Sequence, residues 1–145
     1  MTVEQWSVSG HARAVDSLAR DLAQARARHA YLLTGPQGIG KRTVATAFAQ
    51  AALCKQAGPP CGQCRTCRLI GDARHPDVSI LEPEISGRIV KTAKINIEPV
   101  RQLIRDFSLR PVEASRRIAI LAGFEAATPA AANALLKTLE EPPGN

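Results

Sequence analysis

The chain has 145 residues, 45% of them hydrophobic, so it can bury one core and fits one compact domain, residues 1–145, or a piece of a larger protein. Nineteen Lys and Arg against thirteen Asp and Glu give a net charge of +6, which suits nucleic acid or another acidic partner, or serves solubility alone. No apolar run could cross a membrane and the N-terminus has no signal-peptide core, which argues against a membrane protein and predicts a cytoplasmic one.

Hydrophobic periodicity predicts helices that alternate with short strands. Residues 10–27 read as an amphipathic helix begun by Ser9, and residues 29–35 as a buried strand of a parallel sheet. Further along the chain we expect helices over residues 43–53, 100–107 and 129–141 and strands over residues 77–83 and 117–123, with Thr128 as the last N-cap and Pro142 and Pro143 as the last stop. Residues 84–99 form either a small hairpin or a mobile loop. The alternation predicts a three-layer α/β fold with a parallel sheet and right-handed crossovers.

A glycine-rich stretch, GPQGIGKRT at residues 35–43, lies between a predicted strand and a predicted helix. It satisfies the pattern GxxxxGK, in which backbone N–H groups meet phosphate oxygens at a helix N-terminus and the lysine reaches the β and γ phosphates. A structural glycine turn is the alternative. The candidate nucleotide-binding residues, for ATP or ADP, are Gly35, Pro36, Gly38, Ile39, Gly40, Lys41, Arg42 and Thr43.

The groups that hydrolysis needs are missing. Arg42 stands where such loops place the hydroxyl that binds Mg²⁺, and Thr43 does not replace it because one helical step turns a side chain by about 100°. The strand over residues 117–123 ends in Ala122 and Gly123, without the expected Asp and Glu, and the first acid after it, Glu125, reads as a solvated loop residue unless it reaches the site from the next turn. The sequence therefore predicts no catalytic residues, and Mg²⁺ is not expected.

Four cysteines, Cys54, Cys61, Cys64 and Cys67, form the pattern Cx6Cx2Cx2C within residues 54–67. Disulfides are disfavoured in a reducing compartment, and the spacing suits a tetrahedral zinc ion. Four sulfur ligands leave no open coordination position, so the ion would be structural. An iron–sulfur cluster, disulfides or free thiols are the alternatives. His75, in the stretch RHPD, is expected in a turn because the cysteines already complete a site.

Taken together, these stretches resemble a known family, the bacterial clamp-loader AAA+ subunits of the DNA polymerase III holoenzyme. The resemblance rests on HAYLLTGPQGIGK, on CKQAGPPCGQCRTC with HPD soon after it, and on ANALLKTLEEPP, and it runs from about Val8 to Pro143. In this family the tau/gamma subunits keep the full ATPase motifs, whereas delta-prime subunits are commonly degenerate in them. Arg42, Ala122 and Gly123 make the chain similar to the delta-prime branch.

The resemblance implies an AAA+ P-loop fold with a small zinc module inserted at residues 54–67. It also implies that this fold is incomplete at the C-terminus, since family members are about twice this long. It places the phosphate loop on residues 35–43 and the zinc ligands on the four cysteines, and it implies other clamp-loader subunits, the sliding clamp and primed DNA as partners. The function expected from it is a subunit that helps load the clamp and does not hydrolyse ATP by itself.

Two other functions stay open on the sequence alone. One is an active ATPase of the tau/gamma type with unusual motif residues. The other is a zinc-dependent nucleic-acid-binding module on a P-loop fold, for which Lys55, Arg65 and Arg68 would offer positive charge beside the cysteines. A solvated basic face is the plainer interpretation of those three residues.

Overall fold

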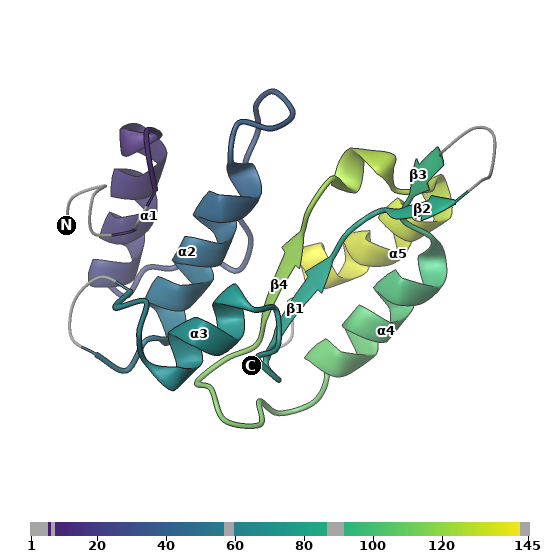
Figure 1. Cartoon of the computed structure of the whole chain (residues 1–145). Coiled ribbons are helices and arrows are strands. Elements are labelled where there is room, and N and C mark those ends of the chain that lie inside the picture. Colours follow the sequence, from purple (N-terminus) through teal and green to yellow (C-terminus); the bar gives the residue numbers. More distant parts are fainter. Residues whose placement is uncertain (1–5, 7, 57–59, 87–91, 143–145) are drawn as a thin grey trace. The chain divides into compact units, whose positions relative to one another are not determined.

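The computed structural model describes residues 6, 8–56, 60–86 and 92–142 and divides the chain into two compact units, Met1–Val78 and Ser79–Asn145. Figure 1 shows the elements of both units coloured along the sequence. The prediction of one domain over residues 1–145 with an insert at residues 54–67 stays a prediction.

The first unit is built from three helices, as the periodicity predicted for the first two of them. These are α1 (Ala12–Ala23), α2 (Lys41–Leu53) and α3 (Arg65–Gly71) (Figure 1). Helices α1 and α2 share one hydrophobic core, because apolar side chains recur on one face of each. The buried members of that core are Trp6, Val8, Val15, Leu18, Ala19, Val44 and Ala47.

Three aromatic rings fasten the irregular segment before the phosphate loop to this core. Phe48 of α2 meets Tyr31 edge to face with ring centroids 5.0 Å apart, and it meets Trp6 at 6.3 Å. The Tyr31 hydroxyl donates to Asp21 Oδ2 of α1 at 2.9 Å, and burial raises the pKa of this phenol. The segment that enters the loop is thus anchored to both helices.

The strand predicted over residues 29–35 does not form within the first unit. Residues 30–34 belong to no strand in the described part of that unit, and Leu32 is 87% exposed. Tyr31 and Leu33 are half-buried against the core while Leu32 faces outward, which is the period-2 pattern of an extended segment. The apolar residues correctly predicted an extended segment. A strand also needs a hydrogen-bonded neighbour, and the described residues of this unit contain no other strand before β1.

The first helix also starts later than predicted. Its N-cap is His11, with a left-handed backbone at φ 59°, and Ser9 does not cap it. The backbone N–H groups of Ala14 and Val15 both donate to the His11 carbonyl, so the first turn is closed by backbone alone. The side chain of His11 is left for another contact, described below.

The second unit contains the parallel strand pair that the sequence predicted. Strand β1 (Val78–Leu81) starts at the unit boundary and lies beside β4 (Ile118–Leu121), and Figure 1 shows both arrows pointing the same way. A separate antiparallel pair joins β2 (Glu84–Ser86) to β3 (Thr92–Lys94). The hairpin alternative for residues 84–99 is therefore confirmed for its two strands, and residues 87–91 between them lie outside the described part.

Two helices and one 3-10 turn complete the second unit. Helix α4 (Ile97–Phe107) begins three residues before its predicted range, and helix α5 (Pro129–Glu140) ends one residue before the end of its own. The 3-10 turn η2 (Phe124–Ala126) joins β4 to α5. Pro142 stands two residues beyond the end of α5, where a proline can no longer interrupt the helix. The two helices pack on a second core, whose buried members are Ile95, Val100, Ala131 and Leu135.

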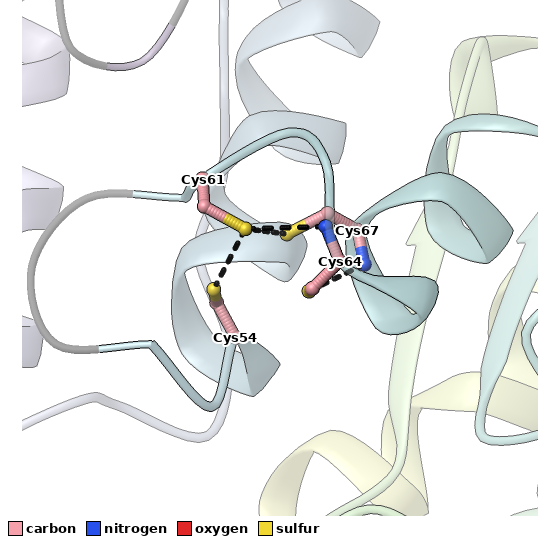
Figure 2. Close-up of side chains that lie close together, drawn as sticks. All are labelled: Cys54, Cys61, Cys64 and Cys67. Carbon is pink, nitrogen blue, oxygen red and sulfur yellow. Dashed lines mark hydrogen bonds between the residues drawn. The ribbon is translucent and has the colours of Figure 1, made fainter.

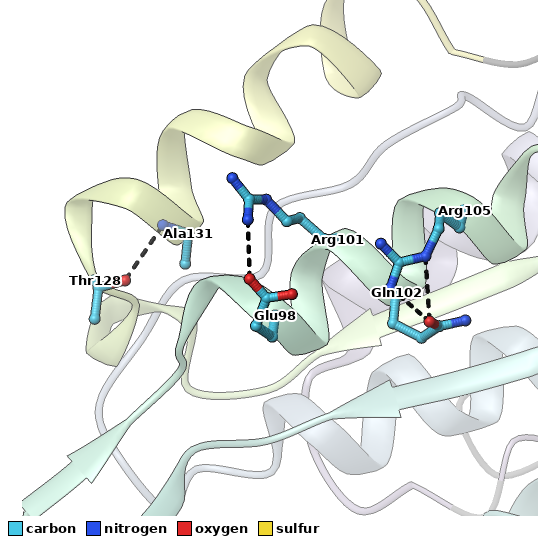
Figure 3. Close-up of polar contacts among 6 residues, drawn as sticks. All are labelled: Glu98, Arg101, Gln102, Arg105, Thr128 and Ala131. Atoms are coloured by element: carbon cyan, nitrogen blue, oxygen red, sulfur yellow. Dashed lines mark hydrogen bonds and ion pairs between the residues drawn. The ribbon is translucent and has the colours of Figure 1, made fainter.

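The start of α5 confirms its predicted cap. Thr128 Oγ1 accepts a hydrogen bond from the backbone N–H of Ala131 at 3.2 Å, and Pro129 occupies the first helical position (Figure 3). A cap of this kind stabilises a helix by about 1 kcal/mol. The exposed face of α4 instead carries local polar pairs, such as Arg101 with Glu98 at 2.9 Å, which contribute less because solvent screens them.

The chain is therefore a mixed α/β protein with a parallel strand pair. None of the helices in the described residues is long and apolar enough to span a membrane.

Candidate functional site

The phosphate loop adopts the tight turns that its glycines predict. Gly38 and Gly40 have positive φ angles of 78° and 99°, a region that side chains disfavour. Gly40 is also the N-cap of α2, so the loop leads directly into a helix N-terminus. The first N–H groups of a helix have no partner within it, and together with the positive end of the helix dipole they favour an anion at such a point.

Lys41 folds back over its own loop. Its ammonium donates to the carbonyl oxygen of Gly35 at 2.7 Å and to that of Pro36 at 2.9 Å. These two bonds hold the positive charge beside the loop, close to where the sequence pattern expects phosphate oxygens. An ammonium group has three donors, so the third is directed elsewhere.

A cavity of about 290 Å³ lies beside the helix end of the loop. Its lining comes from the loop and α2 on one side and from the chain before α1 on the other: Val8, Ser9, His11, Ile39, Gly40 and Thr43. Of the predicted nucleotide-binding residues, the structure thus brings Ile39, Gly40 and Thr43 to one cavity.

At the position after the lysine, the loop has no side-chain hydroxyl that could bind a metal ion. Arg42 stands there and is exposed. Its charge adds to that of Lys41 and to the positive end of the α2 helix dipole. A cation next to a helix N-terminus is unfavourable by itself, so the arrangement is suited to a bound anion more than to a metal ion.

In the second unit, Gly123, just after β4, is a position that disfavours an acidic side chain. Gly123 has a φ of 64°, and a Cβ built there would lie 3.1 Å from Pro83 Cγ. A carboxylate side chain at this position would meet both a disfavoured backbone region and a crowded neighbour. Glu125, two residues later, is exposed in the 3-10 turn, as the interpretation as a solvated acid predicted.

The four cysteines gather into one cluster (Figure 2). All four sulfurs lie within 4.8 Å of one another, and each cysteine is a free thiol. The Cys54 and Cys61 sulfurs are 3.7 Å apart and the Cys61 and Cys67 sulfurs 4.0 Å apart, far beyond the S–S bond length of about 2.05 Å. The structure therefore contains no disulfide here.

These distances fit a single tetrahedral ion. Zinc–sulfur bonds of about 2.3 Å place the corners of a tetrahedron about 3.8 Å apart, since the edge of a tetrahedron is about 1.63 times its centre-to-corner distance. The sulfur–sulfur distances of 3.7 Å for Cys54 and Cys61 and 4.0 Å for Cys61 and Cys67 bracket that value. Four cysteines so arranged can bind a metal such as zinc.

Local backbone geometry shapes the cluster. The N–H of Cys64 donates to the Cys61 sulfur at 3.3 Å, and the N–H of Cys67 donates to the Cys64 sulfur at 3.4 Å, where it caps α3. Bonds from the backbone N–H groups of Cys64 and Gln63 lower the pKa of Cys61 to about 6, so this thiol is ready to bind as a thiolate. Burial, in contrast, raises the pKa of Cys67.

The cluster is also tied to α2. Gln50 Nε2 of that helix donates to the Cys67 carbonyl at 2.7 Å, so the helix that follows the phosphate loop supports the cysteine turn. Just after α3, His75 lies in the turn that was predicted for it and is buried, and its Nδ1 accepts from the Asp77 N–H at 3.1 Å. It is not a member of the metal cluster.

Two side chains matter here that sequence patterns did not identify. His11 lines the cavity and its Nε2 donates to the Ile39 carbonyl at 2.6 Å, and Gln50 supports Cys67. Both contacts join residues far apart in the chain, so no spacing rule could predict them. A histidine before an amphipathic helix was the available signal for the first, and it is a weak one.

Comparison with known proteins gives a family match. Residues 10–145 match the family described as DNA polymerase III, delta subunit. The chain is 40% identical over 124 residues to the DNA polymerase III subunit delta' of Pseudomonas aeruginosa, covering 84% of this chain and 36% of that protein. It is 34% identical over 131 residues to the protein of the same name from Bacillus subtilis, covering 90% of this chain and 38% of that one.

A second group of relatives is more distant. The DNA polymerase III subunit tau/gamma of Haemophilus influenzae is 31% identical over 138 residues, covering 94% of this chain and 19% of that protein. This chain thus spans little more than a third of the length of the delta' relatives and less of the tau/gamma one.

Proposed function

Because this chain belongs to the DNA polymerase III delta-subunit family, we propose that it acts as a delta-prime-type subunit of the clamp loader of the replicative polymerase. Its role would be to help place the sliding clamp on primed DNA as one member of a hetero-oligomeric ring. The fold we propose for it is the AAA+ P-loop fold with three layers, to which the strand pair β1–β4 and the loop–helix unit at residues 35–53 would belong.

The nucleotide site is proposed to bind phosphate without hydrolysing ATP. The observation that carries this is Gly123, whose positive φ and close approach to Pro83 disfavour a carboxylate side chain at that position after β4. Arg42 supports it, because an arginine offers no oxygen ligand to Mg²⁺. Hydrolysis would need both a held metal ion and an acid that orients water.

The cysteine cluster is proposed to hold one structural zinc ion. Cys54, Cys61, Cys64 and Cys67 would be its ligands, and four sulfurs would leave no position for a substrate. The ion would stabilise the turn between α2 and α3 and supply no chemistry of its own.

The proposed partners are the other clamp-loader subunits, the clamp and primed DNA. Contact with DNA would be sequence-independent and sensitive to salt, since the chain offers positive charge and no base-reading motif. The active-ATPase alternative remains an outcome of the tests below, because relatives named tau/gamma also match this chain.

A loading assay tests the proposal. A clamp loader reconstituted from its other subunits should place clamps on primed circular DNA when this protein is present and lose most of that activity when it is left out. Restoration by the protein, with clamp retention on DNA measured after gel filtration, is the expected result. Equal loading with and without it would contradict the proposal.

A further inference from the structure

The side chain of His11 makes a contact that its position in the chain does not require. His11 begins α1, yet its Nε2 lies 2.6 Å from the carbonyl oxygen of Ile39, twenty-eight residues away in the phosphate loop. A carbonyl oxygen can only accept, so the ring nitrogen carries the proton and donates it. The loop is thus tied to the start of α1.

The bond fixes one peptide group of the loop. In a trans peptide the carbonyl and the N–H point in opposite directions. Since the Ile39 carbonyl points at His11, the N–H of Gly40 points away from it, and Gly40 is the N-cap of α2. Gly40 has a positive φ of 99°, a region in which glycine is conformationally permissive, so the bond to His11 restricts the orientation of this peptide.

The backbone of His11 is arranged to make this contact possible. Its φ of 59° is a left-handed conformation that costs most residues roughly 1 kcal/mol, and histidine, asparagine and aspartate adopt it more readily than others. The same residue closes the first turn of α1 through its carbonyl and lines the cavity beside the loop. Backbone and ring therefore serve separate purposes, which substitutions can separate.

From these contacts we infer that His11 is a positioning residue, which holds the Ile39–Gly40 peptide in the orientation that binds phosphate. The inference rests on the proposed nucleotide site and adds to it the residue that orders the loop. Lys41 holds the other end of the loop through Gly35 and Pro36, so the two side chains fix the turn from both sides. Loss of the histidine bond would leave the charge of the site unchanged and its geometry loose.

Two substitutions test this inference. Asparagine at position 11 accepts the left-handed backbone but is too short to reach Ile39, whereas glutamine carries an Nε2 donor at about the reach of the ring. We expect His11→Asn to weaken ADP binding, measured by calorimetry with EDTA present, about five- to tenfold, as one lost neutral hydrogen bond would. His11→Gln keeps the donor but adopts the left-handed backbone less readily, so it should restore part of the affinity.

The outcomes separate the inference from the proposal beneath it. If the unaltered protein binds ADP and loses it on Lys41→Ala, the site exists, and equal affinity of the wild type and His11→Asn would then overturn the role of His11. Equal weakening by the asparagine and glutamine variants would also overturn it. Such a result would indicate a general packing defect, because only the glutamine variant keeps a donor within reach of Ile39. No ADP binding by the unaltered protein would overturn both the nucleotide site and this inference.

Discussion

Removal of the proposed zinc ion is expected to unfold the first unit at temperatures where the zinc-loaded protein would be folded. Chelation, or Cys67→Ser, should lower the stability of this unit by at least about 3 kcal/mol, since zinc binding in small zinc domains amounts to about 10 kcal/mol or more. For a unit of 78 residues, that loss would shift the melting temperature by roughly 12–24 °C. The sulfur cluster lies between α2 and α3, so its loss frees the turn that joins them.

One tryptophan makes the experiment local. Trp6 is the single tryptophan of the chain and is buried in the core of the first unit, so its fluorescence follows that unit. Gln63→Ser, an exposed position in the same turn, is the matched control and should melt within about 0.5 kcal/mol of the wild type.

Chelation also separates metal loss from the cost of a buried hydroxyl. Serine at position 67 would bury a polar group in any case, so the decisive comparison is the added effect of a chelator. The chelator should destabilise the wild type and leave Cys67→Ser unchanged, and the purified wild type should contain about one zinc per chain. If the chelator leaves the Trp6 melting curve of the wild type unchanged, the proposal that a structural ion stabilises this unit would be contradicted.

Lys41→Ala is expected to weaken ADP binding by about tenfold or more. The variant removes the one ammonium group that the structure places on the loop carbonyls of Gly35 and Pro36. Hydrogen bonds from a charged group contribute about 1.5–3 kcal/mol, and each 1.4 kcal/mol is about tenfold in affinity.

An exposed lysine elsewhere in the same unit provides the control. Lys55→Ala removes the same charge from the first unit at a position outside the loop, and its ADP affinity should stay close to that of the wild type. Similar losses in the two variants would mean that general positive charge, and not the loop, attracts the nucleotide.

The sequence predicted the helices better than the strands. Helices α4 and α5 follow from spacing and from Thr128 because a helix satisfies its own backbone, whereas a strand depends on a neighbour that spacing cannot name. Residues 29–35 show this limit, since their apolar pattern predicted a paired strand and residues 30–34 are extended without a strand partner in the described part of the first unit.

The sites divide in the same way. The cysteine cluster and the turns of the phosphate loop follow from short spacings, in which the ligands or turn residues are neighbours in the chain. His11 and the crowding of Gly123 by Pro83 depend on contacts between distant segments, and only the folded structure reveals them. The sequence shows Ala122 and Gly123 in place of acids, but it does not show that Pro83 crowds position 123.

The most direct measurement of the central claim is ATP turnover by the purified protein alone, with Mg²⁺, primed DNA and the clamp present. We expect the rate of phosphate release to equal that of a Lys41→Ala sample. The reason is that the loop lacks a side-chain hydroxyl for Mg²⁺ after the lysine, and no acidic residue follows β4 at positions 122 and 123. Stimulated turnover that disappears in Lys41→Ala would show a working ATPase and contradict the claim.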